Sequence, residues 1–450
     1  MPAPARISRR QTGNAINALQ KDDFPVHGWY RFVLSFPPHL VRQYINSFGL
    51  GPSDALLDPF CGTGTTLVEG KRNRISVFGC DAHPFAALVS RVKTDWNLDR
   101  ALLRRLREQI VESARSTAAK HDLPFALSSD LPLDGEDGIG GLGLTEDEDR
   151  LLPTGFLSRR PLRRLLILRD QIVDQTAQAP GEVRDFFLAA LGHVIANGAG
   201  NFAFGPEIYR TRAKADYDVL GHFAGQAEHM IADLGVVQDA GLAGTASRVF
   251  TDDARTMERI PGDLSAVITS PPYPNEKDYT RTTRVESILL GLITDRASLR
   301  QVKQSLLRSN TRNVFSSDQD GAEVAGFASI QKVCRAIEER RLELGKDSGF
   351  ERLYHKVVAH YFGGMRRHLR ALRPKLRPDA RLAYVVGDQL SFLMVPVATA
   401  TLLSEVAEAE GYRTVGCDLW RERVGSKVRN SAAGATSVRV REEVLLLQPT

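Results

Sequence analysis

The apolar positions of this chain follow two patterns, those of buried strands and of amphipathic helices, and the two alternate near both ends. Residues 55–72 read as a buried strand, a glycine turn and the start of a helix, and 74–84 contain a second short strand. Later strand patterns lie at 247–255, 263–270 and 381–389, with a helix at 395–412 and a terminal strand at 437–448. This alternation predicts an α/β fold with a doubly wound, mostly parallel sheet.

The alternation stops in the middle of the chain, where 99–120 and 159–175 have helical periodicity. The acidic, glycine-rich stretch 128–149 is expected to form a mobile surface loop. We therefore expect a basic N-terminal arm over 1–26, an α/β domain formed by 27–95 and 246–450, a large, mostly helical insertion over 96–245 and a smaller helical insertion over 285–350.

Length and charge set loose limits on function. The 450 residues are 42% hydrophobic and 25% charged, as in ordinary globular proteins, and the chain is too long for one simple core. The net charge of +5 is small beside 59 basic and 54 acidic residues. It permits a polyanionic partner without requiring one.

The cysteines and the apolar runs bear on the compartment. Four cysteines without a C-x-x-C pair favour a reducing compartment and argue against a structural zinc ion, and no metal site is expected. The basic N-terminus lacks the apolar core of a signal peptide, and no apolar run approaches the length of a membrane span. We expect a soluble cytoplasmic protein.

The glycine turn DPFCGTGTT, at 58–66, is the first candidate site. Gly62 and Gly64 allow a sharp turn and a close approach to a ligand, and the helix start offers its amides to a negatively charged group. The turn lacks the lysine of a phosphate-binding loop, which argues against a nucleoside triphosphate. Standing alone, such a turn is more often a plain connection between a strand and a helix.

Acidic residues end the next two predicted strands. Asp81 can accept both hydroxyls of a ribose, or it can cap the following helix. Of Asp252 and Asp253, one can accept a hydrogen bond from an adenine amino group, or both are ordinary turn residues. The glycine turn and Asp81 together favour a bound nucleoside.

The strand at 263–270 ends in the second candidate site, Ser270-Pro271-Pro272-Tyr273. The prolines fix the backbone and present its carbonyl groups, because their own nitrogens cannot donate. A carbonyl beside the Ser270 hydroxyl makes two acceptors for an NH2 group, and Tyr273 offers a flat face on which a base can stack.

DPFCGTGTT and TSPPY together resemble the motifs of the S-adenosylmethionine-dependent DNA amino-methyltransferases, which methylate N4 of cytosine or N6 of adenine. FGCDAHP at 78–84, FTDDAR at 250–255 and LSFPPHLV at 34–41 resemble further segments of that family. The resemblance covers roughly 25–95 and 245–450. It implies a Rossmann-like methyltransferase fold, double-stranded DNA as the substrate, and a possible cognate restriction endonuclease.

The resemblance assigns roles residue by residue. Ser270, Pro271, Pro272 and Tyr273 are the implied catalytic residues. The implied residues for S-adenosylmethionine are Phe36, Pro37, Asp58, Pro59, Phe60, Gly62, Gly64, Thr65, Asp81 and Asp253. For phosphate contacts we expect Arg210, Arg212, Lys214, Arg281 and Arg284. The insertion at 96–245 is the expected target-recognition region, although its place before the adenine-binding strand departs from the family's arrangement.

The target base is open between two choices. A serine before Pro-Pro-Tyr goes more often with cytosine N4 in the family, and aspartate or asparagine with adenine N6, so we expect cytosine. Two rivals remain: an RNA methyltransferase of the guanine-N2 type, which has similar glycine turns, and a catalytically silent DNA-binding module.

Overall fold

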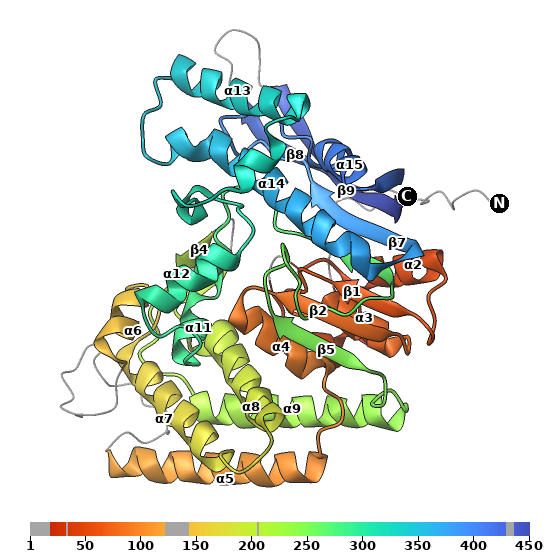
Figure 1. The fold of residues 1–450 in the computed structure, drawn as a ribbon. Coiled ribbons are helices and arrows are strands. Elements are labelled where there is room, and N and C mark those ends of the chain that lie inside the picture. The colour runs from red at the N-terminus through yellow and green to blue at the C-terminus, as the bar shows by residue number, and fades with distance from the viewer. Residues whose placement is uncertain (1–18, 33–34, 122–143, 205–206, 429–435) are drawn as a thin grey trace.

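Seven strands form the central sheet of the protein (Figure 1). The structure is a computed structural model, and it describes residues 19–32, 35–121, 144–204, 207–428 and 436–450. The sheet order is β5-β2-β1-β6-β7-β9-β8. The strands are β1 (Ala55–Asp58), β2 (Ser76–Asp81), β5 (Ser247–Thr251), β6 (Leu264–Thr269), β7 (Leu376–Gly387), β8 (Tyr412–Val428) and β9 (Thr436–Pro449).

The sheet is mostly parallel, as the sequence predicts. β5, β2, β1, β6 and β7 pair in parallel, whereas β9 runs antiparallel to both β7 and β8. From β1 the sheet extends through β2 to β5 in one direction, and from β6 it extends through β7 and β9 to β8 in the other. The strand order therefore reverses between β1 and β6, and open α/β sheets bind ligands at the carboxyl ends of the strands at such a reversal.

Both faces of the sheet are buried under helices. Successive side chains of a strand point to opposite faces, so neighbouring residues of one strand belong to different clusters. Leu56 and Ala266 pack into one cluster with α2, whereas their neighbours Leu57 and Val267 pack into another with α14 and α15. The covering helices are α2 (Pro38–Phe48), α3 (Thr65–Arg72), α4 (Pro84–Thr94), α14 (Tyr354–Leu372) and α15 (Thr399–Ala409).

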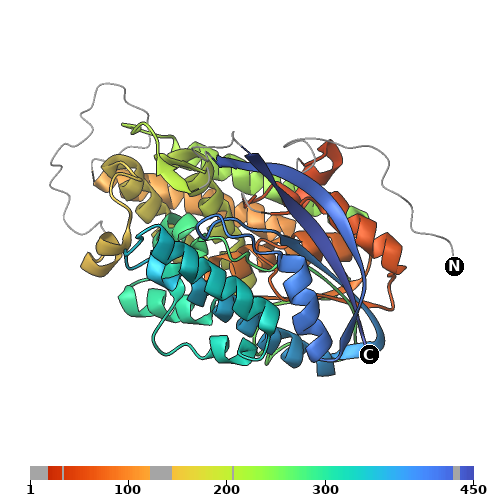
Figure 2. The same ribbon diagram turned by 90° about the horizontal axis from the view of Figure 1, so that it is seen from above.

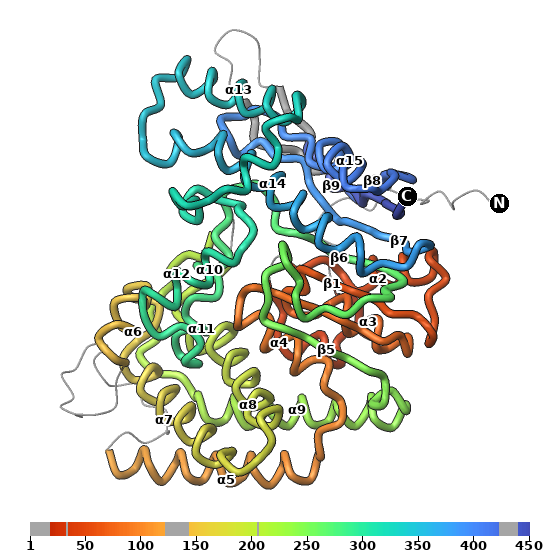
Figure 3. The backbone as a smooth tube through the Cα atoms, in the orientation of Figure 1, coloured from red at the N-terminus to blue at the C-terminus, as the bar shows by residue number. Residues whose placement is uncertain are grey.

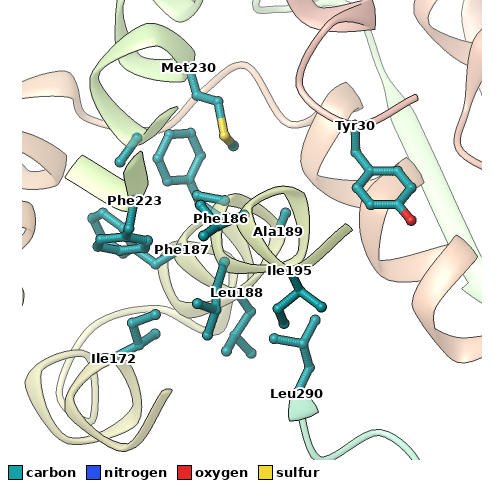
Figure 4. Close-up of a cluster of buried hydrophobic side chains, with 14 of the residues drawn as sticks. Tyr30, Ile172, Phe186, Phe187, Leu188, Ala189, Ile195, Phe223, Met230 and Leu290 are labelled. Carbon is teal, nitrogen blue, oxygen red and sulfur yellow. The ribbon is translucent and has the colours of Figure 1, made fainter. Parts of the chain in front are cut away.

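The middle of the chain is mostly helical, as expected. Its helices share one buried cluster with Phe85 and Leu88 of α4, and Figure 4 shows Phe186, Phe187 and Phe223 in this cluster. The helical core is thus continuous with the covering of the sheet. The elements are α5 (Arg100–Lys120), α6 (Glu146–Leu151), α7 (Arg159–Gln175), α8 (Gly181–Val194), the π-helical turn Ile195–Ala199, β3 (Phe202–Phe204), β4 (Ile208–Arg210) and α9 (Val219–Asp239).

The stretch 285–350 does not gather into a core of its own, and its path can be followed in Figure 3. Val285 and Leu289 join the helical cluster of the middle region, whereas Ile330 and Ile337 pack with α14. Besides α14, the elements between β6 and β7 are α10 (Tyr279–Thr282), α11 (Arg284–Leu289), α12 (Arg296–Ser305), α13 (Ala328–Glu343) and the 3-10 turns Thr311–Asn313, Asp320–Val324, Glu351–Leu353 and Arg373–Lys375.

Two features depart from the sequence-based expectations. No strand was expected over 412–428, yet β8 spans it as the edge strand paired with β9. Residues 20–26 of the expected arm include a 3-10 turn (Lys21–Asp23) and the start of α1 (Phe24–His27), with Asp23 and Val26 buried. The rest of the arm, 1–18, lies outside the described residues, as does most of the loop expected at 128–149, whose last residues begin α6.

No helix within the described ranges is both long enough and apolar enough to cross a bilayer.

Candidate active site

The glycine turn after β1 and the Ser-Pro-Pro-Tyr segment after β6 are joined by a direct hydrogen bond. Thr269, the last residue of β6, donates from Oγ1 to Oδ1 of Asp58 over 2.6 Å, and Asp58 Oδ1 also accepts from the Phe60 amide over 3.1 Å. Thr66 at the start of α3 donates to the Ile268 carbonyl over 3.1 Å. Because β1 and β6 are parallel neighbours, both segments emerge at the same edge of the sheet.

A single cavity of about 860 Å³ opens at this edge. Eleven of the fourteen residues that the sequence assigns to catalysis or the cofactor line it: Phe36, Pro59, Phe60, Gly62, Thr65, Asp81, Asp253, Ser270, Pro271, Pro272 and Tyr273. Asp58 is buried beneath the turn, and Pro37 lines a separate small hollow. Gly64 is held against α4, where a β-carbon would lie 2.7 Å from Ser90 Oγ.

The glycine turn has the conformation that its residues require. Gly62 and Gly64 have φ values of 50° and 88°, which side chains of other residues strain to adopt. Nothing lies within 4 Å of the place a Gly62 β-carbon would take, so the turn leaves room beside its backbone. Gly64 begins α3 without a side-chain cap. The amino end of α3 is therefore suited to a negatively charged group.

Asp81 supports the turn from the neighbouring strand. Its Oδ2 accepts from the Gly62 amide over 2.9 Å and its Oδ1 from the His83 amide over 2.8 Å. Burial raises the pKa of Asp81 to about 6, against the two backbone hydrogen bonds that lower it. Burial also raises the pKa of Asp58, to about 7. Asp81 keeps further lone pairs for a ligand, since each carboxylate oxygen can accept more than one hydrogen bond.

Asp253 faces the cavity after β5 and is held by Arg255. Arg255 donates from Nε to Asp253 Oδ1 over 3.0 Å and from a terminal nitrogen to Oδ2 over 2.6 Å. Its other terminal nitrogen donates to Asp320 over 2.7 Å, and Arg367 pairs with Asp320 from the far side over 2.6 Å. Of the two candidate aspartates, Asp253 lines the cavity and Asp252 does not.

The backbone of α14 lets Asp320 come this close. A β-carbon on Gly363 would lie 1.7 Å from the Asp320 carbonyl oxygen, and one on Gly364 would lie 3.3 Å from Asp320 Oδ2. Any side chain at Gly363 would push the segment away. The cavity wall at Asp253 is thus fixed by a residue of the 285–350 stretch.

Ser270 lines the cavity, and its hydroxyl is held by β7. Its Oγ donates to the Val385 carbonyl oxygen of β7 over 3.1 Å and lies 3.5 Å from the Tyr273 hydroxyl. A hydroxyl has one proton, so donation to Val385 leaves its lone pairs for an incoming donor. Pro271 and Pro272 line the cavity next to it. The Tyr273 hydroxyl donates to Glu442 over 3.4 Å.

Some lining residues carry no motif that sequence reasoning could have found. Trp420, Arg421 and Glu442 come from β8 and β9, and Arg31, Phe32, Phe204, Lys277 and Ser309 come from loops and a short strand. The closest available signal was the aromatic segment that begins at His27, which contains Arg31 and Phe32.

The five expected phosphate contacts are placed outside the cavity lining. Arg210 and Arg212 are exposed. Arg281 lies 3.7 Å from Glu207. Arg284 donates to the Thr280 carbonyl on its own helix over 3.1 Å. Lys214 donates to the carbonyls of Gly198 and Gly200 over 2.5 Å each, so it closes the end of the π-helical turn. Of these residues, Arg210 and Arg212 are thus exposed, whereas the Lys214 ammonium group contacts backbone carbonyls.

Known proteins resemble this chain over most of its length. M.BsoBI of Geobacillus stearothermophilus, a type II methyltransferase, is 23% identical over 89% of this chain and 81% of its own. M.MvaI of Kocuria varians, also a type II methyltransferase, is 20% identical over 84% of this chain and 80% of its own. M.MjaII of Methanocaldococcus jannaschii is 39% identical, but over only 15% of this chain and 13% of its own.

Comparisons with family models and with solved structures do not identify a family for this chain. No family model matches the chain. The solved structure of TrmN from Thermus thermophilus superimposes with a TM-score of 0.25 at 12% identity, covering 95% of this chain and 52% of that one, and an overlap this low carries no argument. The α/β fold and the two long sequence alignments together support a methyltransferase.

Proposed function

We propose that this protein is a site-specific DNA methyltransferase that transfers a methyl group from S-adenosylmethionine to the exocyclic amine of a flipped-out base, cytosine N4. One observation carries the proposal: the glycine turn with Asp81 and the Ser270–Tyr273 segment line the same cavity. Its volume of about 860 Å³ lies within the usual range for ligand pockets. The similarity to type II methyltransferases supports the same reading.

The residues around the glycine turn fit S-adenosylmethionine. The uncapped amino end of α3 suits the carboxylate of its methionine part, and Phe36 lines the cavity beside it. Asp81 would accept from the ribose hydroxyls, and Asp253, held by Arg255, would accept from the adenine amino group. When bound, the cofactor supplies an electrophilic methyl group on its sulfonium.

Ser270 and the proline carbonyls would act on the target amine. An amine on a base is a weak nucleophile because its lone pair is delocalised into the ring. Two acceptors would draw the nitrogen toward tetrahedral geometry and localise that pair. S-adenosylmethionine held at the glycine turn and Asp81 would supply the methyl group to this nitrogen in exchange for its S–C bond, and the surplus amine proton would leave to water. Positioning of the two reactants is worth up to ~7–11 kcal/mol of the barrier in such reactions.

Tyr273 would hold the extruded base. Flipping a base out of the duplex costs a few kcal/mol, and stacking on an aromatic ring returns ~1–3 kcal/mol. The serine before Pro-Pro-Tyr favours cytosine N4, as in the resembling family, over the alternative, adenine N6. Transfer to RNA is the less favoured alternative.

The insertion at 96–245 is proposed to contact double-stranded DNA. Phe204 of β3 lines the cavity, so this region reaches the site itself. β4, paired with β3, carries exposed Tyr209 and Arg210, and exposed Arg212 follows it. Exposed arginines beside the cavity suit phosphate contacts. A restriction endonuclease of the same specificity would be the functional partner.

Transfer of a labelled methyl group tests the proposal. The purified protein is incubated with tritiated S-adenosylmethionine and either DNA from a host that lacks the gene or total RNA. We expect label in DNA alone, and loss of that label in Ser270→Ala with binding of S-adenosylhomocysteine preserved. Label in RNA alone, or in neither polymer, would refute the proposal.

A further inference from the structure

The wall of the cavity beyond Ser270 is built by the long hairpin of β8 and β9, whose two strands run side by side in Figure 2. Trp420 and Arg421 of β8 and Glu442 of β9 line the cavity there. Gly387 of β7 is paired with Glu442, and Glu442 is paired with Arg421. These three residues form one row across three strands, and neighbouring strands lie ~4.8 Å apart.

A chain of polar contacts connects Ser270 to this row. Ser270 Oγ lies 3.5 Å from the Tyr273 hydroxyl, which donates to Glu442 Oε1 over 3.4 Å. The Nε of Arg421 in turn donates to Glu442 Oε2. The Tyr273 ring packs closely on Gly387, where a β-carbon would lie 3.1 Å from Cε2. Glu442 therefore contacts both the tyrosine hydroxyl and the Arg421 guanidinium.

Arg421 differs from an arginine that meets phosphates. Its side chain is 17% exposed and that of Glu442 is 9% exposed, so both lie within the wall rather than at the rim. Arg421 is ion-paired with Glu442, and this pairing reduces its attraction for a bare anion. A planar guanidinium held in a cavity wall instead suits two neighbouring neutral acceptors, because its N–H groups form a rigid fork.

We propose that Arg421 reads the edge of the target base and selects cytosine; this rests on the proposed function. With the N4 amine held by Ser270, the next two positions along the cytosine edge are N3 and O2, and both are acceptors. An arginine fork matches two adjacent acceptors. Adenine with its N6 amine in the same place presents the acceptor N1 and then the C2–H group. Only one N–H group of the fork then finds an acceptor. Arg421 is thus a specificity-determining residue, and Glu442 positions it.

The test needs duplexes with one target base. The methylated position is first mapped by sequencing DNA that the wild-type protein has modified. Two short duplexes then carry that site with either cytosine or adenine at the target position, opposite the same guanine. For each duplex kcat/KM is measured with Arg421→Met, Arg421→Lys and Glu442→Gln. Arg413→Ala is the matched control, because Arg413 lies on the same strand and is exposed.

For Arg421→Met we expect kcat/KM on the cytosine duplex to fall about 10- to 100-fold, the discrimination typical of one bidentate contact. The ratio of kcat/KM on the cytosine duplex to that on the adenine duplex should fall by a similar factor. The affinity for S-adenosylhomocysteine should stay within twofold of the wild-type value. Arg421→Lys should not restore the preference, since a single ammonium lacks the fork. Glu442→Gln should lower the same ratio with Arg421 still present. This variant therefore tests the proposal even if Arg421→Met does not fold.

An unchanged cytosine preference in folded Arg421→Met, or an equal loss in Arg413→Ala, would overturn the role of Arg421 and leave the proposed function intact. A wild-type protein that yields no N4-methylcytosine would overturn both.

Discussion

Thr269 Oγ1 lies 2.6 Å from Asp58 Oδ1, and this contact ties the end of β6 to the end of β1. Both side chains are buried, with exposures of 0% and 1%. The glycine turn and the Ser-Pro-Pro-Tyr segment follow these two residues directly. The proposed cofactor site and the proposed base site therefore share one fixed junction, which in-line transfer between two bound molecules would require.

Thr269→Val should weaken this junction, because it keeps the shape of the side chain and removes the donor. Loss of one partner leaves part of a buried carboxylate unsatisfied, so the free energy of unfolding should fall by about 1–3 kcal/mol. Urea unfolding measures this. Thr269→Ser keeps the hydroxyl and is the control. A valine variant as stable as the wild type would show that the contact is not important.

Cofactor affinity should depend on pH through Asp81. Burial raises its pKa to about 6. Its ionised form is the better acceptor for ribose hydroxyls, so affinity for S-adenosylhomocysteine should fall as the pH drops through 6. With only about one tenth of Asp81 ionised at pH 5, we expect a loss approaching tenfold relative to pH 7.5. Calorimetry at several pH values measures it.

Asp81→Asn is the control for this pH dependence, and it should bind more weakly with a flat profile near pH 6. The effect of Asp81 ionisation on the free energy of unfolding has the opposite sign to its effect on cofactor affinity. The folded state holds the Asp81 proton more tightly than the unfolded chain, whose ordinary value is 3.8. This residue therefore lowers stability as the pH rises from about 4 to 6. If the affinity of Asp81→Asn for S-adenosylhomocysteine still falls as the pH drops through 6, a group other than Asp81 is responsible.

Asp320 should affect the cofactor without touching it. It holds Arg255, which holds Asp253 by both carboxylate oxygens. Asp320→Asn should raise the dissociation constant for S-adenosylhomocysteine about tenfold, equivalent to ~1.4 kcal/mol, with kcat at saturating cofactor nearly unchanged. Arg367→Gln removes only the outer ion pair of Asp320 and should have a much smaller effect. Equal effects of the two variants would contradict this order of contacts.

Tyr273→Ala should impair binding of the extruded base and leave cofactor binding unchanged. Loss of stacking worth ~1–3 kcal/mol predicts a fall in kcat/KM for DNA of about 10- to 100-fold. Affinity for S-adenosylhomocysteine should stay within twofold. Tyr273→Phe keeps the ring and loses the contact with Glu442, so it should retain most of the activity. If the alanine variant loses cofactor binding to the same extent, the ring is structural.

The sequence indicated those candidate residues whose conformation depends on local chemistry. Glycines with positive φ, an acidic residue at a strand end and a rigid proline pair have their effect within a few residues, so Gly62, Asp81 and Ser270 could be identified from their neighbours alone. The parallel strands at 55–58 and 263–270 were identified for a similar reason, since strands buried on both faces are continuously apolar.

The rest of the cavity depends on contacts between distant segments. β8 is an edge strand on which Arg413, Val415, Cys417 and Leu419 are exposed, so it lacks the apolar run of a buried strand. Trp420 and Arg421 reach the site only because β8 pairs with β9. Asp320 reaches Arg255 only because Gly363 leaves room, and nothing near Asp320 in the sequence indicates this.

The composition of nucleosides in modified DNA tests the central claim most directly. DNA from a host that lacks the gene is incubated with the protein and S-adenosylmethionine, digested to nucleosides and analysed by mass spectrometry. We predict N4-methylcytosine, absent when Ser270→Ala replaces the wild type. 5-Methylcytosine as the product, or no methylated nucleoside at all, would contradict transfer to an amine held by Ser270.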